Sequence, residues 1–206
     1  MIYFLFFLIL ILGGLFAKNR EVSNVYLFVI MMLLLLIIGL RDVTVGVDTA
    51  SYINDYENIS RMSFSEMWKY ALATEEPLYV IISWFPSMFS LNFTSYLMLW
   101  ALFPVVSLYK MFKSELVDGY DYIVSIIVFF LLGLFAFYVA GIRQTAALSV
   151  IFLGYRYLNK LSLKGIRAFL MDKNVYLFLL TIAVAYMIHN SSIIFLLALP
   201  CLFFRV

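Results

Sequence analysis

The stretch Val22–Leu40 reads VSNVYLFVIMMLLLLIIGL and contains no charged residue. A helix of about 20 mostly apolar residues is long enough to cross the hydrocarbon core of a bilayer, which is about 30 Å thick. Other runs without Lys, Arg, Asp or Glu approach or exceed this length: Met1–Ala17, Pro77–Tyr109, Tyr122–Ile142 and Asn174–Phe204. The last of these runs contains His189. The sequence therefore predicts several membrane-spanning segments.

The composition supports the same class of protein. Hydrophobic residues make up 66% of the chain and charged residues 13%, which is unlike a soluble globular domain. Isolated strands cannot satisfy their backbone groups in lipid, and the runs lack the alternation of a barrel. We therefore expect an all-α fold, a polytopic transmembrane helical bundle, with residues 1–206 forming one transmembrane domain. The formal charge of +2 does not indicate nucleic acid as a partner, and the single Cys201 has no cysteine to pair with.

The distribution of basic residues suggests a topology. Ten of the fourteen Lys and Arg residues can be placed in the cytoplasm, following the positive-inside rule: Lys18, Arg20, Lys110, Lys113, Arg156, Lys160, Lys164, Arg167, Lys173 and Arg205. The N-terminus is then outside, and the 33-residue run Pro77–Tyr109 crosses only once. A break is expected in SWFPSMFSLNFTS, where proline, serine and asparagine cluster.

A second topology is also open. If Pro77–Tyr109 crosses twice, the N-terminus is inside and the basic residues divide eleven inside to three outside. Charge counting does not choose between the two arrangements. In both, Arg143 and His189 face outward, because the basic segment between residues 156 and 173 is inside. The segment 41–76 joins them outside in the first arrangement only.

Segment 41–76 is the longest polar part of the chain, and its acidic residues outnumber its basic ones. Within it, SFSE at Ser63–Glu66 has the spacing of a capping box. The apolar residues that follow recur at helical intervals: Phe64, Met67, Trp68, Ala71 and Leu72. We expect an extracytoplasmic loop that contains a helix lying on the membrane surface.

Polar residues stand at three places where an apolar run meets the predicted outer face. They are Arg41 and Asp48 in GLRDVTVGVDTASY, Arg143 and Gln144 in GIRQTAAL, and His189 and Asn190 in HNSS. Two arginines and the only histidine facing one lumen suit an anionic ligand, since guanidinium groups match phosphate oxygens. Nearby carboxylates could bind or activate sugar hydroxyls.

Each of these residues also has a structural explanation. Arg41 could be an ordinary interfacial arginine, Asp48 could cap the following helix, and Tyr52 could be an interfacial aromatic. Glu76 before Pro77 could mark the start of a span, and His189 could belong to a turn between spans.

The same stretches, in the same order, resemble the EpsG family of Wzy-like membrane polysaccharide polymerases. The likeness covers residues 39 to 200 and is carried by Arg41, Gly46, Asp48, Tyr52, Glu76, Pro77, Arg143, Gln144, His189 and Ser191. It implies a fold related to the integral-membrane (GT-C-like) glycosyltransferases. It also implies polymerisation of undecaprenyl-diphosphate-linked oligosaccharide repeat units into exopolysaccharide, capsule or O-antigen, at the outer face of a bacterial cytoplasmic membrane.

Such a glycosyl transfer releases a diphosphate, whose charge must be neutralised. The chain has no D-x-D pair, which favours arginine over a metal ion, and no cofactor is expected. Asp48 and His189 are the candidates for the base that accepts the proton of the attacking hydroxyl. The predicted substrate-binding residues are Arg41, Arg143, Gln144, Tyr52 and Glu76.

Family members usually continue through further spans, so the resemblance implies that these residues are the amino-terminal portion of such a protein. Other polysaccharide-assembly membrane proteins are then expected partners beside the lipid-linked substrate and the bilayer. Two functions from other classes stay open: a transporter or flippase of lipid-linked glycans, which would also place arginines in an outward cavity, and a noncatalytic assembly subunit.

Overall fold

The computed structural model of the protein describes residues 1–116, 118–161 and 169–201. All regular elements in these ranges are helices, which confirms the all-α prediction. Lys164, Arg167 and Arg205, assigned above to the cytoplasm, lie outside the described residues. The chain forms two compact units: a first unit of Met1–Tyr52 and Phe93–Ile142, and a second unit of Ile53–Asn92 with the described part of Arg143–Val206.

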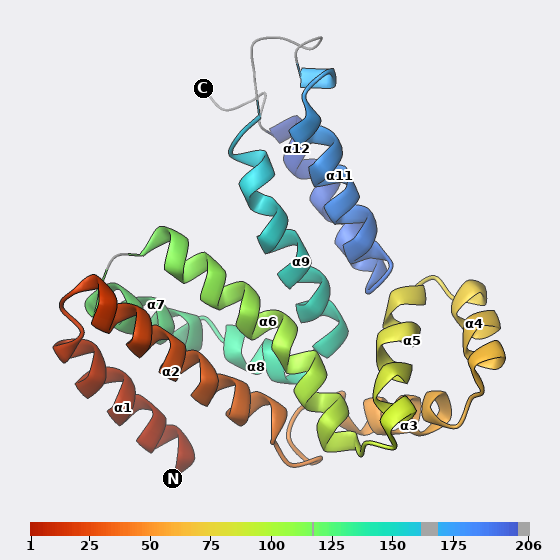
Figure 1. Ribbon diagram of the computed structural model, residues 1–206, viewed down its shortest axis with the longest axis horizontal. Coiled ribbons are helices and arrows are strands. Elements are labelled where there is room, and N and C mark those ends of the chain that lie inside the picture. The colour runs from red at the N-terminus through yellow and green to blue at the C-terminus, as the bar shows by residue number, and fades with distance from the viewer. Residues whose placement is uncertain (117, 162–168, 202–206) are drawn as a thin grey trace. The chain divides into compact units, whose positions relative to one another are not determined.

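The described part of the first unit is built mainly from α1 (Ile2–Phe16), α2 (Arg20–Gly39), α6 (Phe93–Glu115), α7 (Gly119–Leu131) and α8 (Leu134–Ala140), with the start of α3 (Thr49–Ser60). Helix α2 packs along α6, and α1 packs against α7 (Figure 1). Leu27, Leu34 and Ile38 recur at the spacing of one helix face and are almost fully buried. They belong to one core with Val105 and Leu108 of α6. The apolar stripe of α2 therefore supplies the centre of this unit.

Helices α1 and α7 approach each other very closely at Gly119. A Cβ atom on Gly119 would lie 2.4 Å from the carbonyl oxygen of Gly14 and 2.7 Å from the Cβ of Ala17. The Gly119 N–H donates to the Ala17 carbonyl at 3.0 Å. Only a residue without a side chain fits between these backbones.

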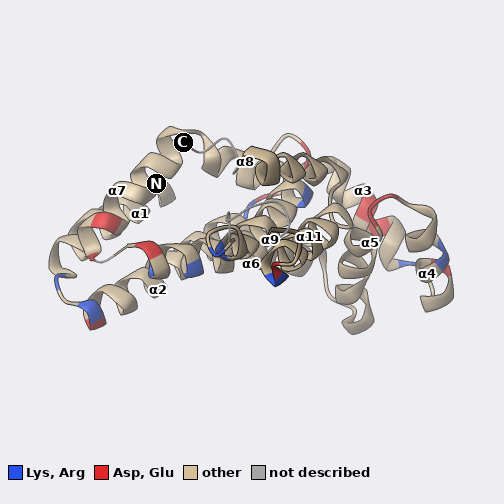
Figure 2. Cartoon of the chain, turned by 90° about the horizontal axis from the view of Figure 1, so that it is seen from above, with Lys and Arg blue, Asp and Glu red and all other residues tan. Residues whose placement is uncertain are grey.

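Among the described residues, two helices, α2 and α6, are long and apolar enough to cross a membrane. Helices α7 and α8 make a third candidate if they are taken together, but they are bent by 64° at Leu132 and Gly133, where Gly133 has φ +71°. The run Tyr122–Ile142, expected as one continuous span, is thus broken. In α2 and α6 the charged residues lie near the helix ends, which leaves the middle of these two helices apolar, whereas α3 and α4 carry charged residues along their length (Figure 2).

The predicted break in Pro77–Tyr109 is confirmed. Helix α5 (Pro77–Trp84) continues into the 3₁₀ helix η1 (Phe85–Phe89), and the chain then leaves the helical path at Ser90, which has φ 52°. Helix α6 begins at Phe93. Of the two parts of this run, α6 is long and apolar enough to cross a membrane, whereas Pro77–Phe89 is a shorter apolar segment, as α1 and α11 are. The single crossing stays a prediction.

The second unit contains the end of α3 (Thr49–Ser60), α4 (Phe64–Ala73), α5, η1, α9 (Ile142–Leu158), α11 (Lys173–Tyr186), η2 (Asn190–Leu197) and α12 (Ala198–Cys201). Helix α4 packs on α5, and η2 folds back along α11. The predicted capping box is present: Ser63 Oγ accepts from the Glu66 N–H, and Glu66 accepts from the Ser63 N–H at 2.8 Å. Met67 and Ala71 face inward, whereas Phe64, Trp68 and Leu72 are exposed.

Candidate functional site

Glu76 is the centre of a polar cluster in the second unit. Its Oε2 accepts a hydrogen bond from Nη1 of Arg143 at 3.1 Å. Its Oε1 lies 2.6 Å from Nδ1 of His189 and accepts from the backbone N–H of Asn190 at 3.2 Å. The side chains of Glu76 and His189 are only 14% and 15% exposed, and that of Arg143 is 34% exposed. One carboxylate therefore ties together three segments of the chain.

The local fold explains why Glu76 is available for these contacts. Glu76 is the N-cap residue of α5 and Pro77 is its first helical residue, but the Glu76 side chain makes no capping hydrogen bond. The first N–H groups of α5 are satisfied elsewhere, because Leu78 and Tyr79 both donate to the carbonyl of Met187 at the end of α11. These bonds place the start of α5 beside residues 187–190 and leave the carboxylate free to reach Arg143.

Arg143 is the second residue of α9, so the start of this helix sets its position. Further along, α9 meets α11 at Gly154, where a Cβ atom would lie only 2.4 Å from Cγ2 of Thr181. Since α11 leads directly to His189 and α9 carries Arg143, this contact helps to fix the distance between the two partners of Glu76.

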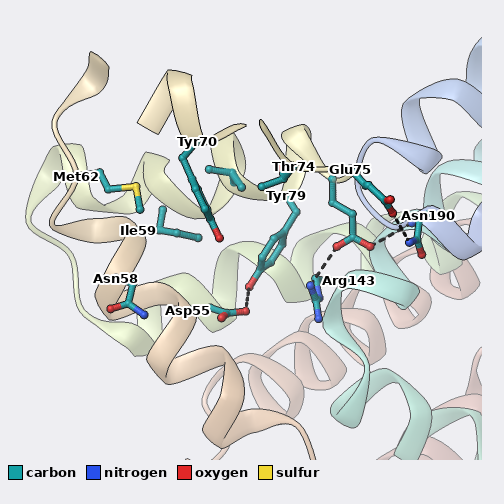
Figure 3. A pocket seen from close by; sticks show the side chains of 12 residues that line it. Asp55, Asn58, Ile59, Met62, Tyr70, Thr74, Glu75, Tyr79, Arg143 and Asn190 are labelled. Atoms are coloured by element: carbon teal, nitrogen blue, oxygen red, sulfur yellow. Dashed lines mark hydrogen bonds and ion pairs between the residues drawn. The ribbon is translucent and has the colours of Figure 1, made fainter. Parts of the chain in front are cut away.

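A cavity of about 330 Å³ opens beside this cluster (Figure 3). Glu75, Glu76, Arg143 and Asn190 line one end, and Asn190 Nδ2 donates to Glu75 Oε2 at 3.0 Å. His189 does not line the cavity and meets its wall through the contact with Glu76.

The other end of the cavity is formed by α3 and carries a second polar pair. Tyr79 OH donates to Oδ2 of Asp55 at 3.0 Å, and Asn58 lies on the next turn of the same helix. The Arg143 guanidinium carbon lies 4.9 Å from the centre of the Tyr79 ring, within the range of a cation–π contact. Tyr79 thus joins the two ends, and the polar contacts run without interruption from Asp55 to His189.

The cavity is acidic as a whole. Three carboxylates line it, those of Asp55, Glu75 and Glu76, against the single guanidinium of Arg143. No three His, Cys, Asp or Glu side chains in the described ranges lie close enough together to hold a metal ion. The arrangement can bind hydroxyl groups through carboxylate and amide atoms at one end and present a positive charge at the other.

The structure brings together three of the residues predicted from the sequence, Glu76, Arg143 and His189, with Asn190 beside them. Gln144 follows Arg143 on α9, but it is exposed and does not line the cavity. Glu76 is separated along the chain from Arg143 by 67 positions and from His189 by 113 positions, so the cluster depends on long-range contacts.

The other predicted residues, Arg41, Asp48 and Tyr52, belong to the first unit. Arg41 is 9% exposed, and its Nη1 donates to the carbonyl of Ile38 at 2.7 Å. Its Nε and Nη2 atoms are buried without a hydrogen-bond partner among the described residues, and burial lowers the pKa of the guanidinium. Tyr52 is buried, whereas Asp48 is exposed immediately before α3.

Sequence reasoning missed Asp55, Asn58, Tyr79 and Glu75. Asp55 and Asn58 are three residues apart on α3, a spacing that places both on one helix face, and this signal was available in the sequence. Tyr79 follows Glu76 by three residues at the start of α5, so the two also share a face. Neither spacing indicates which other segment of the chain the pair contacts, because those segments lie far away along the sequence.

Fold and site together define an all-helical membrane protein with a partly buried carboxylate, arginine and histidine cluster beside a polar cavity. The chain belongs to the EpsG family, whose sequence model matches residues 24–206. The match confirms the resemblance stated from the sequence. No curated protein and no solved structure matches the chain. The relation to the GT-C-like glycosyltransferases stays a prediction.

Proposed function

We propose that this protein takes part in polysaccharide polymerisation as a membrane glycosyltransferase that joins undecaprenyl-diphosphate-linked oligosaccharide repeat units at the outer face of the bacterial cytoplasmic membrane. Membership of the EpsG family supports the polymerase-type role. The observation that carries the proposal is the pair Arg143 and Glu76 on the wall of a cavity rich in hydroxyl-binding groups, with His189 in contact with Glu76. A glycan needs groups that bind hydroxyls, and a diphosphate needs a cation, so a substrate that contains both needs the two kinds of group side by side.

In the proposed reaction, a hydroxyl of the acceptor sugar attacks the anomeric carbon of the donor. The new glycosidic bond forms as the bond from that carbon to the diphosphate oxygen breaks, and the diphosphate leaves with the electron pair. Arg143 is the cation that stabilises the growing negative charge. Glu76 holds the guanidinium in the resting site, so an incoming diphosphate competes with Glu76 for it.

The hydroxyl proton needs an acceptor. With a proton on Nδ1, His189 donates to Glu76 and keeps a lone pair on Nε2, which is the protonation state of a general base held by a carboxylate. Asp48 in the first unit remains the second candidate base, and Arg41, Tyr52 and Gln144 remain proposed substrate-binding residues.

A reconstitution experiment tests the proposal. The protein is placed in liposomes with purified lipid-linked repeat units, and the products are resolved on a gel. A ladder of polymers is expected from a polymerase. Movement of the lipid-linked units across the bilayer without a ladder would instead indicate a flippase. A ladder that forms only after another membrane protein is added, and that persists when Arg143 is replaced, would indicate a noncatalytic subunit.

A further inference from the structure

We infer that the cavity between Asp55 and Arg143 is a subsite for an uncharged sugar ring and that it discriminates against acidic sugars such as uronic acids. This inference rests on the proposed function for the ligand being a glycan. The cavity itself supplies the class of sugar, through its charge, its hydrogen-bonding groups and its size.

The charge of the cavity opposes a carboxylate on the ligand. Its ionised lining carries three negative charges and one positive charge, and the positive one is already paired with Glu76. A uronate carboxylate in this space would face net repulsion from two uncompensated negative charges, those of Asp55 and Glu75. At separations of a few ångströms, with partial screening, such repulsion corresponds to roughly a tenfold loss of affinity or more.

The hydrogen-bonding groups suit hydroxyls. Tyr79 occupies Oδ2 of Asp55, and the other carboxylate oxygen can accept from a ligand hydroxyl. The amide of Asn58 offers both donors and an acceptor, which matches the dual character of a hydroxyl group. Thr74 also lines the cavity, and its hydroxyl, which donates to the Ala71 carbonyl at 3.1 Å, can accept from a ligand hydroxyl.

The apolar part of the lining suits the C–H face of a sugar ring. Ile59 and Val80 are buried and line the cavity with Met62, and the ring of Tyr70, which is 46% exposed, also lines it. A volume of about 330 Å³ is at the small end of the range for ligand sites, about 300 to 1,000 Å³. The space therefore fits a single sugar ring with its substituents better than an extended oligosaccharide.

A matched pair of ligands tests the inference. Methyl β-glucopyranoside and methyl β-glucopyranosiduronate differ only in a hydroxymethyl group replaced by a carboxylate. Binding of each to the full chain is measured by saturation-transfer NMR in a zwitterionic detergent that has no sugar headgroup, since a maltoside headgroup would itself compete for the cavity. We expect the neutral glycoside to bind and the uronide to bind at least about tenfold more weakly. Equal or tighter binding of the uronide would overturn the inference.

Three variants locate the binding. Asp55→Ala removes a charged acceptor and is expected to weaken binding of the neutral glycoside by about tenfold. Glu75→Gln removes one negative charge and is expected to reduce the difference in affinity between the glycoside and the uronide. Glu57→Gln is the matched control, because Glu57 is an exposed carboxylate on the same helix that pairs with Arg61 and does not line the cavity. Unchanged glycoside binding in a folded Asp55→Ala protein would place the sugar elsewhere and refute the subsite.

The binding assay does not depend on polymerisation. If the protein selects the neutral glycoside but forms no ladder from lipid-linked units, the proposed reaction fails and the subsite stands. If a ladder forms while the uronide binds as well as the glycoside, the subsite fails and the polymerase stands.

Discussion

Replacing Glu76 by alanine should destabilise the second unit more than any comparable change at its surface. The mutation removes the acceptor of Arg143, His189 and the Asn190 N–H at once. Hydrogen bonds to a charged group contribute about 1.5–3 kcal/mol each when little solvent reaches them. The full value applies best to His189, whereas the bond to Arg143 is discounted to below about 1 kcal/mol because that side chain is 34% exposed.

These contributions do not add fully, because the three donors share one carboxylate. We therefore expect Glu76→Ala to lower the free energy of unfolding by about 3 kcal/mol, and Glu76→Gln, which keeps the shape but loses the charge, by about 1–2 kcal/mol. Glu75→Ala is the control next to it in the sequence. Glu75 is exposed and accepts one side-chain hydrogen bond from Asn190, so its loss should cost less than about 1 kcal/mol.

Reversible unfolding in mixed detergent micelles measures these changes in the free energy of unfolding. Double-mutant cycles then give the separate coupling of Glu76 to His189 and to Arg143. The coupling between Glu76 and His189 should exceed that between Glu76 and Arg143, because the first contact is shorter and less exposed. A Glu76→Ala protein no less stable than Glu75→Ala, or a larger coupling to Arg143 than to His189, would refute this account of the cluster.

Three further predictions concern the surrounding structure. Gly154→Ala should cost about 1–3 kcal/mol, because the new methyl group meets Thr181, and Thr181→Ala should recover part of the loss in thermal unfolding; an unchanged melting temperature would show that α9 and α11 can separate freely. Ser63→Ala should destabilise α4 by about 1 kcal/mol in amide exchange. Hydrogen bonds from the Ser63 hydroxyl and backbone N–H lower the pKa of Glu66, so the stability they provide is complete above the usual glutamate pKa of about 4.3 and is lost as pH falls through the lowered pKa; the variant keeps only the backbone donor and should show a smaller loss at acidic pH. In a protein whose Cys201 is replaced by serine, a cysteine at position 57 should react with a membrane-impermeant thiol reagent in intact cells and one at position 110 should not; a cysteine at position 57 that fails to react, like the one at position 110, would favour the rival topology.

Much of the fold is readable from the sequence because it depends on local patterns. The apolar stripe of α2 follows from its 3.6-residue spacing, and the capping box at Ser63 and Glu66 fixes the start of α4. The break before α6 follows from the proline and the polar residues around Ser90. The bend between α7 and α8 carries a weaker signal, since Gly133 is one glycine in an otherwise apolar run and nothing local requires it to take a positive φ.

The site is harder to predict because its contacts are long-range. Arg143 and His189 could be recognised as candidates, but nothing near either residue indicates that Glu76 joins them. The position of Glu76 is set by the hydrogen bonds that the Leu78 and Tyr79 N–H groups donate to the Met187 carbonyl. These are main-chain groups, so the sequence carries no signature of them. Asp55 was overlooked for the same reason: it gains meaning only when α5 places the Tyr79 hydroxyl against it.

The most direct test of the central claim is polymer formation from lipid-linked repeat units by Arg143 variants in a reconstituted system that polymerises with the unaltered protein. Arg143→Lys keeps the charge but loses the planar guanidinium, and it should lose most of the polymer. Arg143→Ala should lose more, with single lipid-linked units accumulating, whereas Arg61→Ala, at an arginine that is 78% exposed and paired with Glu57, should leave the ladder intact. Polymer of normal amount and length from a folded Arg143→Ala protein would contradict the account.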